Sequence, residues 1–205
     1  MGLSGARDDV LARVRAALAD VPRDEAPVAP GYEPPAPPGV DPVARFVDRV
    51  SDYRATVRET RDVAATVAEV CAEHAARRIG VPRDLPAEWR PRDVELVTDD
   101  GLSARELDAL DGALTGCALA IAETGTIVLD GGERSGRRAL TLVPDLYLCV
   151  VERARVVATV PEAFRALEGA RGPFTLVSGP SATSDIELDR VEGVHGPRRL
   201  EVVLV

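Results

Sequence analysis

The chain has 205 residues, a length typical of one domain with a short appendage. Its apolar fraction of 45% is ordinary for a globular protein, whereas its net charge of −9 disfavours nucleic acids and anionic membrane surfaces as partners, because both attract a basic face. The longest strongly apolar stretch, residues 113–122, is too short to cross a bilayer, and the first residues contain no apolar signal core. The sequence therefore predicts a cytoplasmic protein.

The cysteines, histidines and lysines narrow the possible chemistry. Three cysteines stand at 71, 117 and 149, too far apart for a C-x-x-C pair, so we expect no zinc ribbon and no iron–sulfur cluster in this chain. All three lie in apolar runs, which indicates buried, reduced thiols. Two histidines exclude a multi-histidine metal centre, and the absence of lysine excludes a G-x-x-x-x-G-K phosphate loop. We expect no cofactor in this chain and assign no metal ligands, and the sequence leaves open whether a metal enters the pocket.

A proline-rich segment separates an N-terminal helix from the rest of the chain. Apolar residues at helical spacing predict a helix over residues 4–20 with a narrow apolar stripe. Half of the sixteen prolines lie between Pro22 and Pro42, where fixed φ angles and missing N–H donors favour an extended linker. We place the domain boundary at its end, with the helix and linker in residues 1–42 and an α/β domain in residues 43–205.

The first half of that domain is predicted to be mainly helical. Hydrophobic periodicity predicts one short strand over residues 94–98 and helices over residues 42–57, 61–77 and 102–110. Ser103 begins the last of these helices with the spacing of a capping box. His74 lies on the apolar face of the second helix, where a packed histidine with a hydrogen-bonded imidazole is favoured over a functional one.

After residue 116 the hydrophobic pattern is typical of strands. Apolar, β-branched runs separated by turn residues predict a helix over residues 161–167 and strands over residues 117–122, 126–129, 140–143, 146–151, 156–160, 174–178 and 200–205. Several runs are apolar without alternation, which is typical of strands covered on both faces. Helices that alternate with such strands predict an open, layered α/β sheet.

The turn A-E-T-G-T at residues 122–126 is the first candidate site. Gly125 lets the backbone turn sharply and lets a ligand approach closely. The hydroxyls of Thr124 and Thr126, with free backbone N–H groups, form a natural anion cradle, and Glu123 adds a carboxylate at its rim. The alternative interpretation is a β-turn with polar capping.

A second candidate, S-G-P-S-A-T-S-D-I-E at residues 178–187, follows a predicted strand. Ligands of open α/β sheets bind beyond the carboxyl ends of strands, and small hydroxyl residues suit a hydroxylated or anionic ligand. Ser184 and Glu187 also have capping-box spacing, so the stretch can equally be the start of a helix. The two interpretations are compatible, because a helix N-terminus itself attracts anions.

Two further stretches contain candidate residues. His195 stands in E-G-V-H-G-P, where the flanking glycines and proline fix a tight loop, and a histidine held in this way is a candidate general acid–base. The alternative is an exposed histidine in a turn that leads into the last strand. The loop G-G-E-R-S-G-R-R at residues 131–138 is a candidate mobile clamp whose arginines bind a carboxylate, or else a solvated hairpin loop.

Four motifs in order resemble one known family. They are A-E-T-G-T-I-V-L at 122–129, L-T-L-V-P-D at 140–145, S-G-P-S-A-T-S-D-I-E at 178–187 and G-V-H-G-P at 193–197. Together they are similar to the lactate-utilisation protein C family, which has the LUD domain. The resemblance is strongest over residues 115–205, and four motifs in register are far more specific than any one of them.

The resemblance implies a fold, a function and partners. The implied fold is an α/β sheet of the ribose-phosphate isomerase, glucosamine-phosphate deaminase and CoA transferase-like type. The implied function is a component of a system that oxidises L-lactate to pyruvate, in which two iron–sulfur partner proteins hold the clusters that this chain lacks. Relatives by fold bind phosphorylated or carboxylated ligands, so a small anionic metabolite is expected. The family often carries arginine after Ser181, where this chain has Ala182. If that arginine helps to bind an anion, either Arg137, Arg138 or Arg198 replaces it in this chain or the ligand differs.

This hypothesis names a set of site residues. The residues expected to bind the ligand are Thr124, Gly125, Thr126, Arg137, Arg138, Gly179, Pro180, Ser181, Thr183, Glu187 and Gly196. The residues expected to orient it or to exchange protons are Glu123, Asp185 and His195. Gly125→Val is expected to abolish binding with little change in fold. Two alternatives remain open: a stand-alone isomerase or transferase with Glu123 as base or nucleophile, and a regulatory subunit that senses a metabolite.

Overall fold

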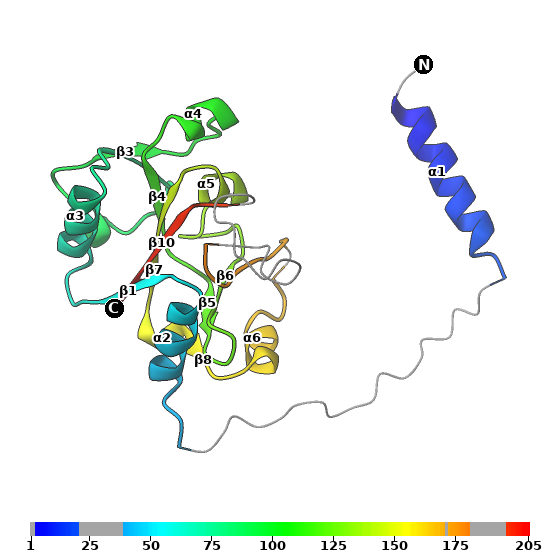
Figure 1. Ribbon diagram of the computed structural model, residues 1–205. Helices are drawn as coiled ribbons and strands as arrows, with labels where there is room; N and C mark the ends of the chain where they lie inside the picture. Colours follow the sequence, from blue (N-terminus) through cyan, green and yellow to red (C-terminus); the bar gives the residue numbers. More distant parts are fainter. Residues whose placement is uncertain (1–2, 21–38, 171, 181–195) are drawn as a thin grey trace. The chain divides into compact units, whose positions relative to one another are not determined.

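The computed structural model describes residues 3–20, 39–170, 172–180 and 196–205. The chain divides into two compact units, Met1–Pro34 and Pro35–Val205. In the first unit the predicted helix is present as α1, Leu3–Ala17, drawn in blue in Figure 1. All other elements belong to the second unit.

A parallel sheet forms the centre of the second unit. In the described residues its strand order is β1-β10-β7-β4-β2-β3, and every neighbouring pair is parallel. The strands are β1 (Thr56–Glu59), β2 (Arg78–Val81), β3 (Glu95–Thr98), β4 (Gly112–Thr115), β7 (Leu146–Val151) and β10 (Arg199–Leu204). Every residue of β4 and β7 is buried, so these central strands are covered on both faces, as the unbroken apolar run of β7 predicts.

A smaller sheet has the order β8-β5-β6-β9. Its strands are β5 (Leu119–Ile121), β6 (Thr126–Leu129), β8 (Val156–Val157) and β9 (Thr175–Val177). β6 is antiparallel to both β5 and β9, with Leu129 opposite Thr175 and Ile127 opposite Val177. The first residues of β6 therefore lie beside the point where β9 ends.

Helices cover the two sheets in layers. They are α2 (Pro42–Asp52), α3 (Val63–Glu73), α4 (Ala104–Asp108), α5 (Arg138–Leu142) and α6 (Val160–Ala166), with short 3₁₀ helices η1 (Ala87–Trp89) and η2 (Arg153–Arg155). The helix α3 and η1 pack on one face of the parallel sheet, and α2 lies between its other face and the smaller sheet (Figure 1). α6 packs on the smaller sheet.

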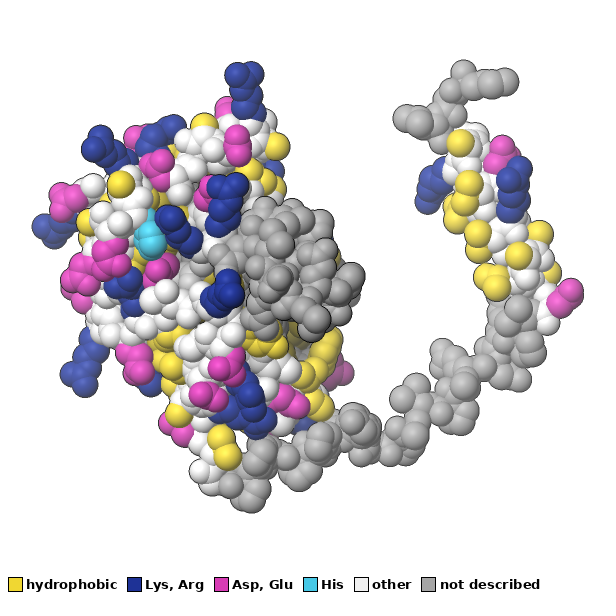
Figure 2. Space-filling view, in the orientation of Figure 1, with side chains coloured by type: hydrophobic (Ala, Val, Ile, Leu, Met, Phe, Trp, Pro, Cys, Tyr) yellow, Lys and Arg dark blue, Asp and Glu magenta, His cyan; other side chains and the backbone are white. Residues whose placement is uncertain are grey.

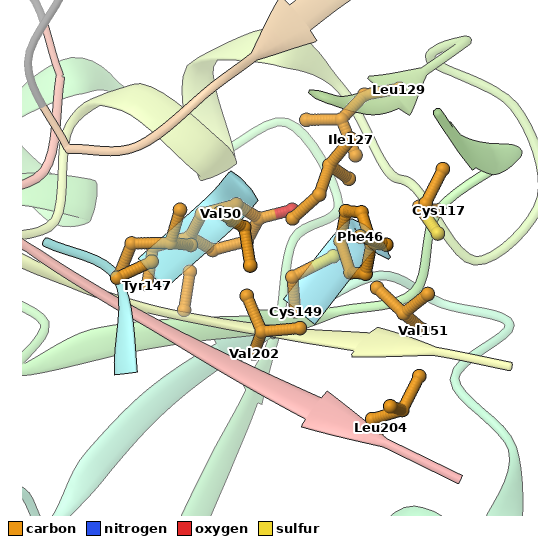
Figure 3. Packing of buried hydrophobic residues seen from close by; sticks show 14 of the residues in the cluster. Phe46, Val50, Cys117, Ile127, Leu129, Tyr147, Cys149, Val151, Val202 and Leu204 are labelled. Carbon is orange, nitrogen blue, oxygen red and sulfur yellow. The ribbon is translucent and has the colours of Figure 1, made fainter. Parts of the chain in front are cut away.

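The main hydrophobic core joins the two sheets through α2. Phe46 and Val50 of α2 are fully buried among Tyr147 and Cys149 of β7 and Ile127 of β6 (Figure 3). Burial of a large side chain contributes about 1.5–3 kcal/mol to stability. The position of α2, and with it the β5–β6 turn, is therefore fixed by this core.

Two predicted helices end earlier than the periodicity indicates. The helix predicted over residues 42–57 ends at Asp52 and is followed by β1, and the helix predicted over residues 61–77 ends at Glu73 and is followed by β2. In both cases a non-glycine residue with positive φ comes directly after the helix C-cap residue. The sequence lacks the usual glycine signal there, so the ends of both helices were missed.

Three short elements also differ from the prediction. Residues 140–143 were predicted as a strand but lie in α5 and its C-cap, because five residues are too few to display a helical period. The strand predicted over residues 156–160 ends at Val157, since the Thr159 side chain caps α6 from Val160 onward. The strand β4 was not predicted. The capping box at Ser103, by contrast, is confirmed.

Three features of the described residues bear on the binding of nucleic acids, membranes and metals. Acidic and basic side chains are interspersed over the visible described surface, rather than gathered into one basic face (Figure 2). Within the described ranges, no helix is long and apolar enough to span a membrane. In the same ranges, no three acidic, cysteine or histidine side chains are grouped as a metal site.

Candidate functional site

The β5–β6 turn packs tightly against α2. Gly125 has φ +62°, and a Cβ atom built on it would lie 2.7 Å from both the carbonyl carbon of Arg49 and the backbone nitrogen of Val50. Both atoms belong to the backbone of α2, so they cannot move away as a flexible side chain would. Gly125 is therefore required by the turn and by the packing of α2. This geometry argues against the prediction that Gly125→Val would leave the fold little changed.

A chain of three hydroxyls joins the first two sequence motifs. The Oγ1 atoms of Thr124 and Thr126 are 2.7 Å apart, and Thr126 Oγ1 is also 2.7 Å from Ser178 Oγ. Thr126 is only 4% exposed, whereas Thr124 and Ser178 are half-buried. The antiparallel pairing of β6 and β9 brings these residues together over 52 positions of sequence. We call this group, with Gly125 and Gly179, the hydroxyl corner.

Gly179 closes the hydroxyl corner on its other side. Its φ is +103°, and a Cβ atom there would lie 2.5 Å from Tyr53 Cβ and 2.8 Å from the Tyr53 carbonyl oxygen. Tyr53 is the C-cap residue of α2, so the end of α2 touches both turns of the hydroxyl corner. Pro180 follows and is buried. Gly179 and Pro180 thus set the path of the chain as it leaves β9.

Thr126→Val is expected to lower the free energy of unfolding by about 1 kcal/mol. The change removes the central hydroxyl of the chain, but Thr124 and Ser178 are half-buried and can bond to water instead. Thr98→Val, at an exposed position of β3, is the matched control and should change stability by less than about 0.5 kcal/mol. Urea unfolding of both variants checks the result. Equal losses would show that the hydroxyl chain does not stabilise the turn.

The Glu123 carboxylate is engaged with the start of α6. Its Oε2 atom accepts a hydrogen bond of 3.1 Å from the backbone N–H of Val160. A carboxylate that satisfies an unpaired N–H at a helix start is a common structural arrangement. The described geometry therefore gives Glu123 a capping role, which corresponds to the polar-capping alternative for this turn.

Several predicted residues lie outside the described ranges. They are Ser181, Thr183, Asp185, Glu187 and His195. Gly196 is described, and a Cβ atom there would lie 3.7 Å from Leu142 Cδ2, at the end of α5. The assignment of all six residues as ligand-binding or catalytic stays a prediction.

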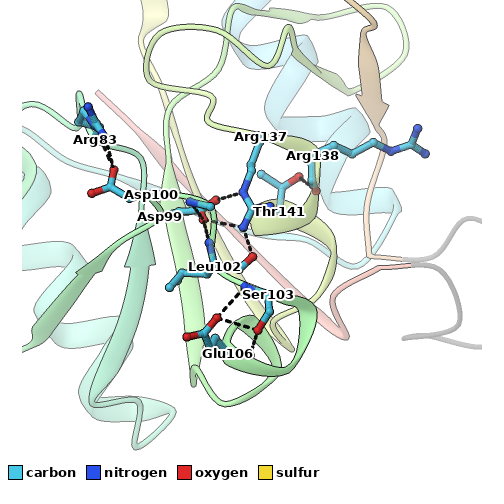
Figure 4. A network of polar contacts seen from close by, with 10 residues as sticks. Arg83, Asp99, Asp100, Leu102, Ser103, Glu106, Arg137, Arg138 and Thr141 are labelled. Carbon is cyan, nitrogen blue, oxygen red and sulfur yellow. Dashed lines mark hydrogen bonds and ion pairs between the residues drawn. The ribbon is translucent and has the colours of Figure 1, made fainter.

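Arg137 anchors the loop at residues 131–138, which differs from the mobile-clamp interpretation of this loop. Its Nε and one terminal nitrogen each donate a 2.6 Å hydrogen bond to the Asp99 carboxylate, and that nitrogen also donates to the Leu102 carbonyl (Figure 4). The Asp99 side chain is only 1% exposed. Burial alone would raise the pKa of Asp99, but hydrogen bonds from Arg137 and from the backbone N–H groups of Leu102 and Gly101 outweigh it, so the pKa lies below its usual value.

Arg138 differs from its neighbour. Its side chain is exposed, forms no hydrogen bond or ion pair within the described part of the chain, and extends away from the Arg137–Asp99 pair (Figure 4). Both arginines line a cavity with Leu129, the last residue of β6, whereas Thr126 is its first residue. At about 3.3 Å per residue, the two ends of β6 are about 10 Å apart. The structure therefore does not bring the two arginines to the hydroxyl corner.

His74 is a packed, hydrogen-bonded histidine, as favoured from sequence. Its Nε2 atom lies 3.1 Å from Glu201 Oε1, and its Nδ1 atom lies 3.3 Å from a terminal nitrogen of Arg199. Arg58 donates a second hydrogen bond of 3.0 Å to Glu201, which is 4% exposed. His74 thus helps to compensate a buried carboxylate. The sequence shows neither this partnership nor that of Arg137 with Asp99, because both join residues far apart in the chain.

Comparison with known proteins identifies the family. The sequence model of the LUD domain matches residues 43–205. This chain belongs to the LUD domain family. The match extends from α2 to the last residue of the sequence, and the resemblance inferred from the four motifs is confirmed.

Relatives of this LUD domain protein include several bacterial proteins. Lactate utilization protein C from Deinococcus radiodurans is 46% identical over 181 residues, which are 86% of this chain and 85% of that protein. The protein of the same name from Geobacillus sp. is 27% identical over 162 residues, 68% of this chain and 67% of that protein. The one from Bacillus pumilus is 39% identical over 92 residues, 42% and 38% of the two chains.

A solved structure supports the fold class of the LUD domain. The crystal structure of a DUF162 family protein from Deinococcus radiodurans superimposes with a TM-score of 0.70 and 38% sequence identity. The match covers 80% of this chain and 96% of that one. The predicted α/β fold class is confirmed, and the structure adds that the larger sheet is parallel.

Proposed function

We propose that this chain is a component of a system that oxidises L-lactate to pyruvate, acting with two iron–sulfur partner proteins and binding a small anionic ligand. The observation that carries the proposal is the 46% identity to lactate utilization protein C of Deinococcus radiodurans, which extends over 86% of this chain. This similarity extends over most of both chains, and its length exceeds that of the LUD domain at residues 43–205. A shared role in lactate utilisation is the simplest function that fits it.

The sequence supports the division of labour in this proposal. Its three cysteines are separated by 32 residues or more, and all three are buried free thiols in the structure. Iron–sulfur clusters are held by several thiolates gathered around one site. In this proposal the electrons removed from L-lactate therefore pass to clusters of the partner proteins, and this chain binds and positions a ligand.

The hydroxyl corner is the proposed ligand site of this function. Three hydroxyls and two tightly packed glycines from separate motifs meet there. The residues that follow Pro180 in sequence, 181–187, add further hydroxyl and acidic groups. Hydroxyls and backbone N–H groups at strand ends suit a small anion, which supports the anionic ligand of the proposal.

The proposal is tested by purification under native conditions. The full chain is tagged in its own organism and recovered anaerobically, and the co-purifying proteins are identified. Iron–sulfur proteins are expected in the eluate, together with L-lactate-dependent reduction of an electron-accepting dye. The isolated chain should show no such activity. A strain that lacks this chain is the control. Its eluate should show no L-lactate-dependent dye reduction and the strain should grow poorly on L-lactate, and the wild-type gene should restore both.

Three other outcomes would contradict the proposal. Recovery of the chain without iron–sulfur partners and without L-lactate-dependent dye reduction would remove the basis of the proposal. Turnover of a phosphorylated sugar or a CoA ester by the isolated chain would favour a stand-alone enzyme. Saturable metabolite binding without turnover, coupled to a change in partner affinity, would favour a regulatory subunit.

A further inference from the structure

A second cavity lies at the other end of β6 from the hydroxyl corner. It has a volume of about 280 Å³ and is formed by the end of β6, the start of β9, the loop at residues 131–138 and the first turn of α5. Its lining includes Leu129, Asp130, Arg138, Pro173 and Thr175. None of the three hydroxyls of the hydroxyl corner belongs to it. We call it the Arg138 cavity.

The cavity has one guanidinium whose charge is not compensated by an ion pair within the described residues. Arg137 also lines the cavity, but Asp99 binds its guanidinium through two hydrogen bonds. Arg138 has no such partner in the described ranges, while its backbone carbonyl accepts a 3.1 Å hydrogen bond from Thr141 Oγ1. A planar guanidinium of this kind is the preferred protein group for binding a carboxylate through two hydrogen bonds.

A carboxylate stands in the same lining. Asp130 Oδ1 accepts a 3.0 Å hydrogen bond from the backbone N–H of Gly132, which fixes the direction of the side chain. A ligand with only a carboxylate would be attracted by Arg138 and repelled by Asp130. A ligand that carries both a carboxylate and a neighbouring hydroxyl satisfies both groups, because the hydroxyl can donate to Asp130.

The remaining lining is mainly apolar, with Leu129 and Pro173 among its residues. We propose that the Arg138 cavity binds a small 2-hydroxycarboxylate, with the carboxylate on Arg138, the hydroxyl on Asp130 and the alkyl group against Leu129 and Pro173. The choice of L-lactate as probe rests on the proposed function, whereas the cavity and its charges do not.

The first experiment compares ligands and arginine variants of the full chain by titration followed by NMR. The wild-type chain is expected to bind L-lactate saturably, and to bind it more tightly than propanoate, which lacks the hydroxyl. Arg138→Gln should weaken the binding of both by about tenfold or more, because it removes a charge-assisted hydrogen-bonding group. Arg83→Gln is the matched control: Arg83 is 81% exposed and pairs with Asp100 outside the cavity, so binding should not change.

A second variant tests the hydroxyl contact. Asp130→Asn keeps Oδ1 for the Gly132 N–H but replaces the other carboxylate oxygen by an amide nitrogen. It should remove most of the preference for L-lactate over propanoate. An unchanged preference would overturn the assignment of the hydroxyl to Asp130. Circular dichroism and thermal unfolding of each variant exclude loss of fold as the cause.

The outcomes separate this inference from the proposed function. No saturable binding by the wild-type chain, or equal binding by Arg138→Gln, would overturn the inference. Binding lost in Thr126→Val but kept in Arg138→Gln would place the ligand at the hydroxyl corner and would overturn it too. If dye reduction with partner proteins persists in that case, the proposed function stands. If Arg138-dependent binding is found without partners or dye reduction, the inference stands and the proposed function fails.

Discussion

Gly125→Ala is expected to lower the free energy of unfolding by about 3 kcal/mol. Two costs add in this variant. An L-residue at φ +62° loses about 1–2 kcal/mol relative to glycine, and a Cβ atom 2.7 Å from the backbone of Arg49 and Val50 adds an overpacking cost of about 1–3 kcal/mol. The backbone of α2 cannot shift away at a low energetic cost, because Phe46 and Val50 hold the helix in the main core. Valine should cost more than alanine, since its branched side chain adds bulk at the same point.

Gly101→Ala separates the two costs. Gly101 has φ +98° but no atom within 4 Å of a Cβ built on it, so only the conformational cost of about 1–2 kcal/mol applies. Urea unfolding of both variants, evaluated with a common m-value, gives the difference directly. Equal losses would mean that α2 adjusts at no cost and that the close packing of the turn is not important. A larger loss at Gly125 would mean that binding tests at the hydroxyl corner should use Thr126→Val rather than any change at Gly125.

The strands that the sequence predicts well share one property. Residues 146–151 and 126–129 are apolar runs of strand length bounded by turn residues, so burial and length point to the same element. The missed strands β1 and β2 follow helices that end without a local signal. Arg54 and Ala75 adopt left-handed backbone there, although neither residue type favours it, because tertiary packing outweighs local preference.

The hydroxyl corner could be predicted in part, because its residues are small, polar and placed at turns. The motifs at 122–126 and 178–187 are separate in the sequence, and the antiparallel pairing of β6 with β9 brings Thr126 of the first beside Ser178 of the second. The tight contact of both turns with α2 could not be predicted. It depends on Arg49 and Tyr53, which lie 73 and 69 residues before Ala122, the first residue of the first motif, and carry no motif of their own.

The two arginines of the loop at residues 131–138 have different roles that sequence alone does not separate, because the residue that separates them is distant in the chain. Arg137 and Arg138 are adjacent and chemically identical, so sequence alone offers no reason to distinguish them. Asp99 distinguishes them in the fold, 38 positions away from Arg137. One arginine becomes a structural anchor and the other is left at the wall of a cavity.

Arg137→Leu is expected to lower the free energy of unfolding by about 2 kcal/mol at pH 7. Removing one partner of a fully buried ion pair costs about 3–5 kcal/mol, and the cost is smaller here because the Arg137 side chain is 41% exposed and partly screened by water. Among the described residues, the Asp99 carboxylate would then keep its hydrogen bonds from the N–H groups of Gly101 and Leu102 and no ion pair. Arg138→Leu, one residue later and without a partner in the described ranges, is the matched control and should change stability by less than about 0.5 kcal/mol.

The pH dependence of this loss identifies its cause. In the wild-type chain the pKa of Asp99 is held below its usual value, so the stabilisation is complete above the unfolded pKa of about 3.9 and is lost as the pH falls through the lower folded pKa. Without Arg137, burial raises the pKa of Asp99, so the carboxyl group is protonated at higher pH and the penalty is relieved. The stability difference between wild type and Arg137→Leu should therefore shrink between pH 7 and pH values below about 4, measured by urea unfolding. A difference that does not change with pH would assign the loss to packing. A difference that shrinks would show that charge pairing holds the loop, and with it the wall of the Arg138 cavity, in place.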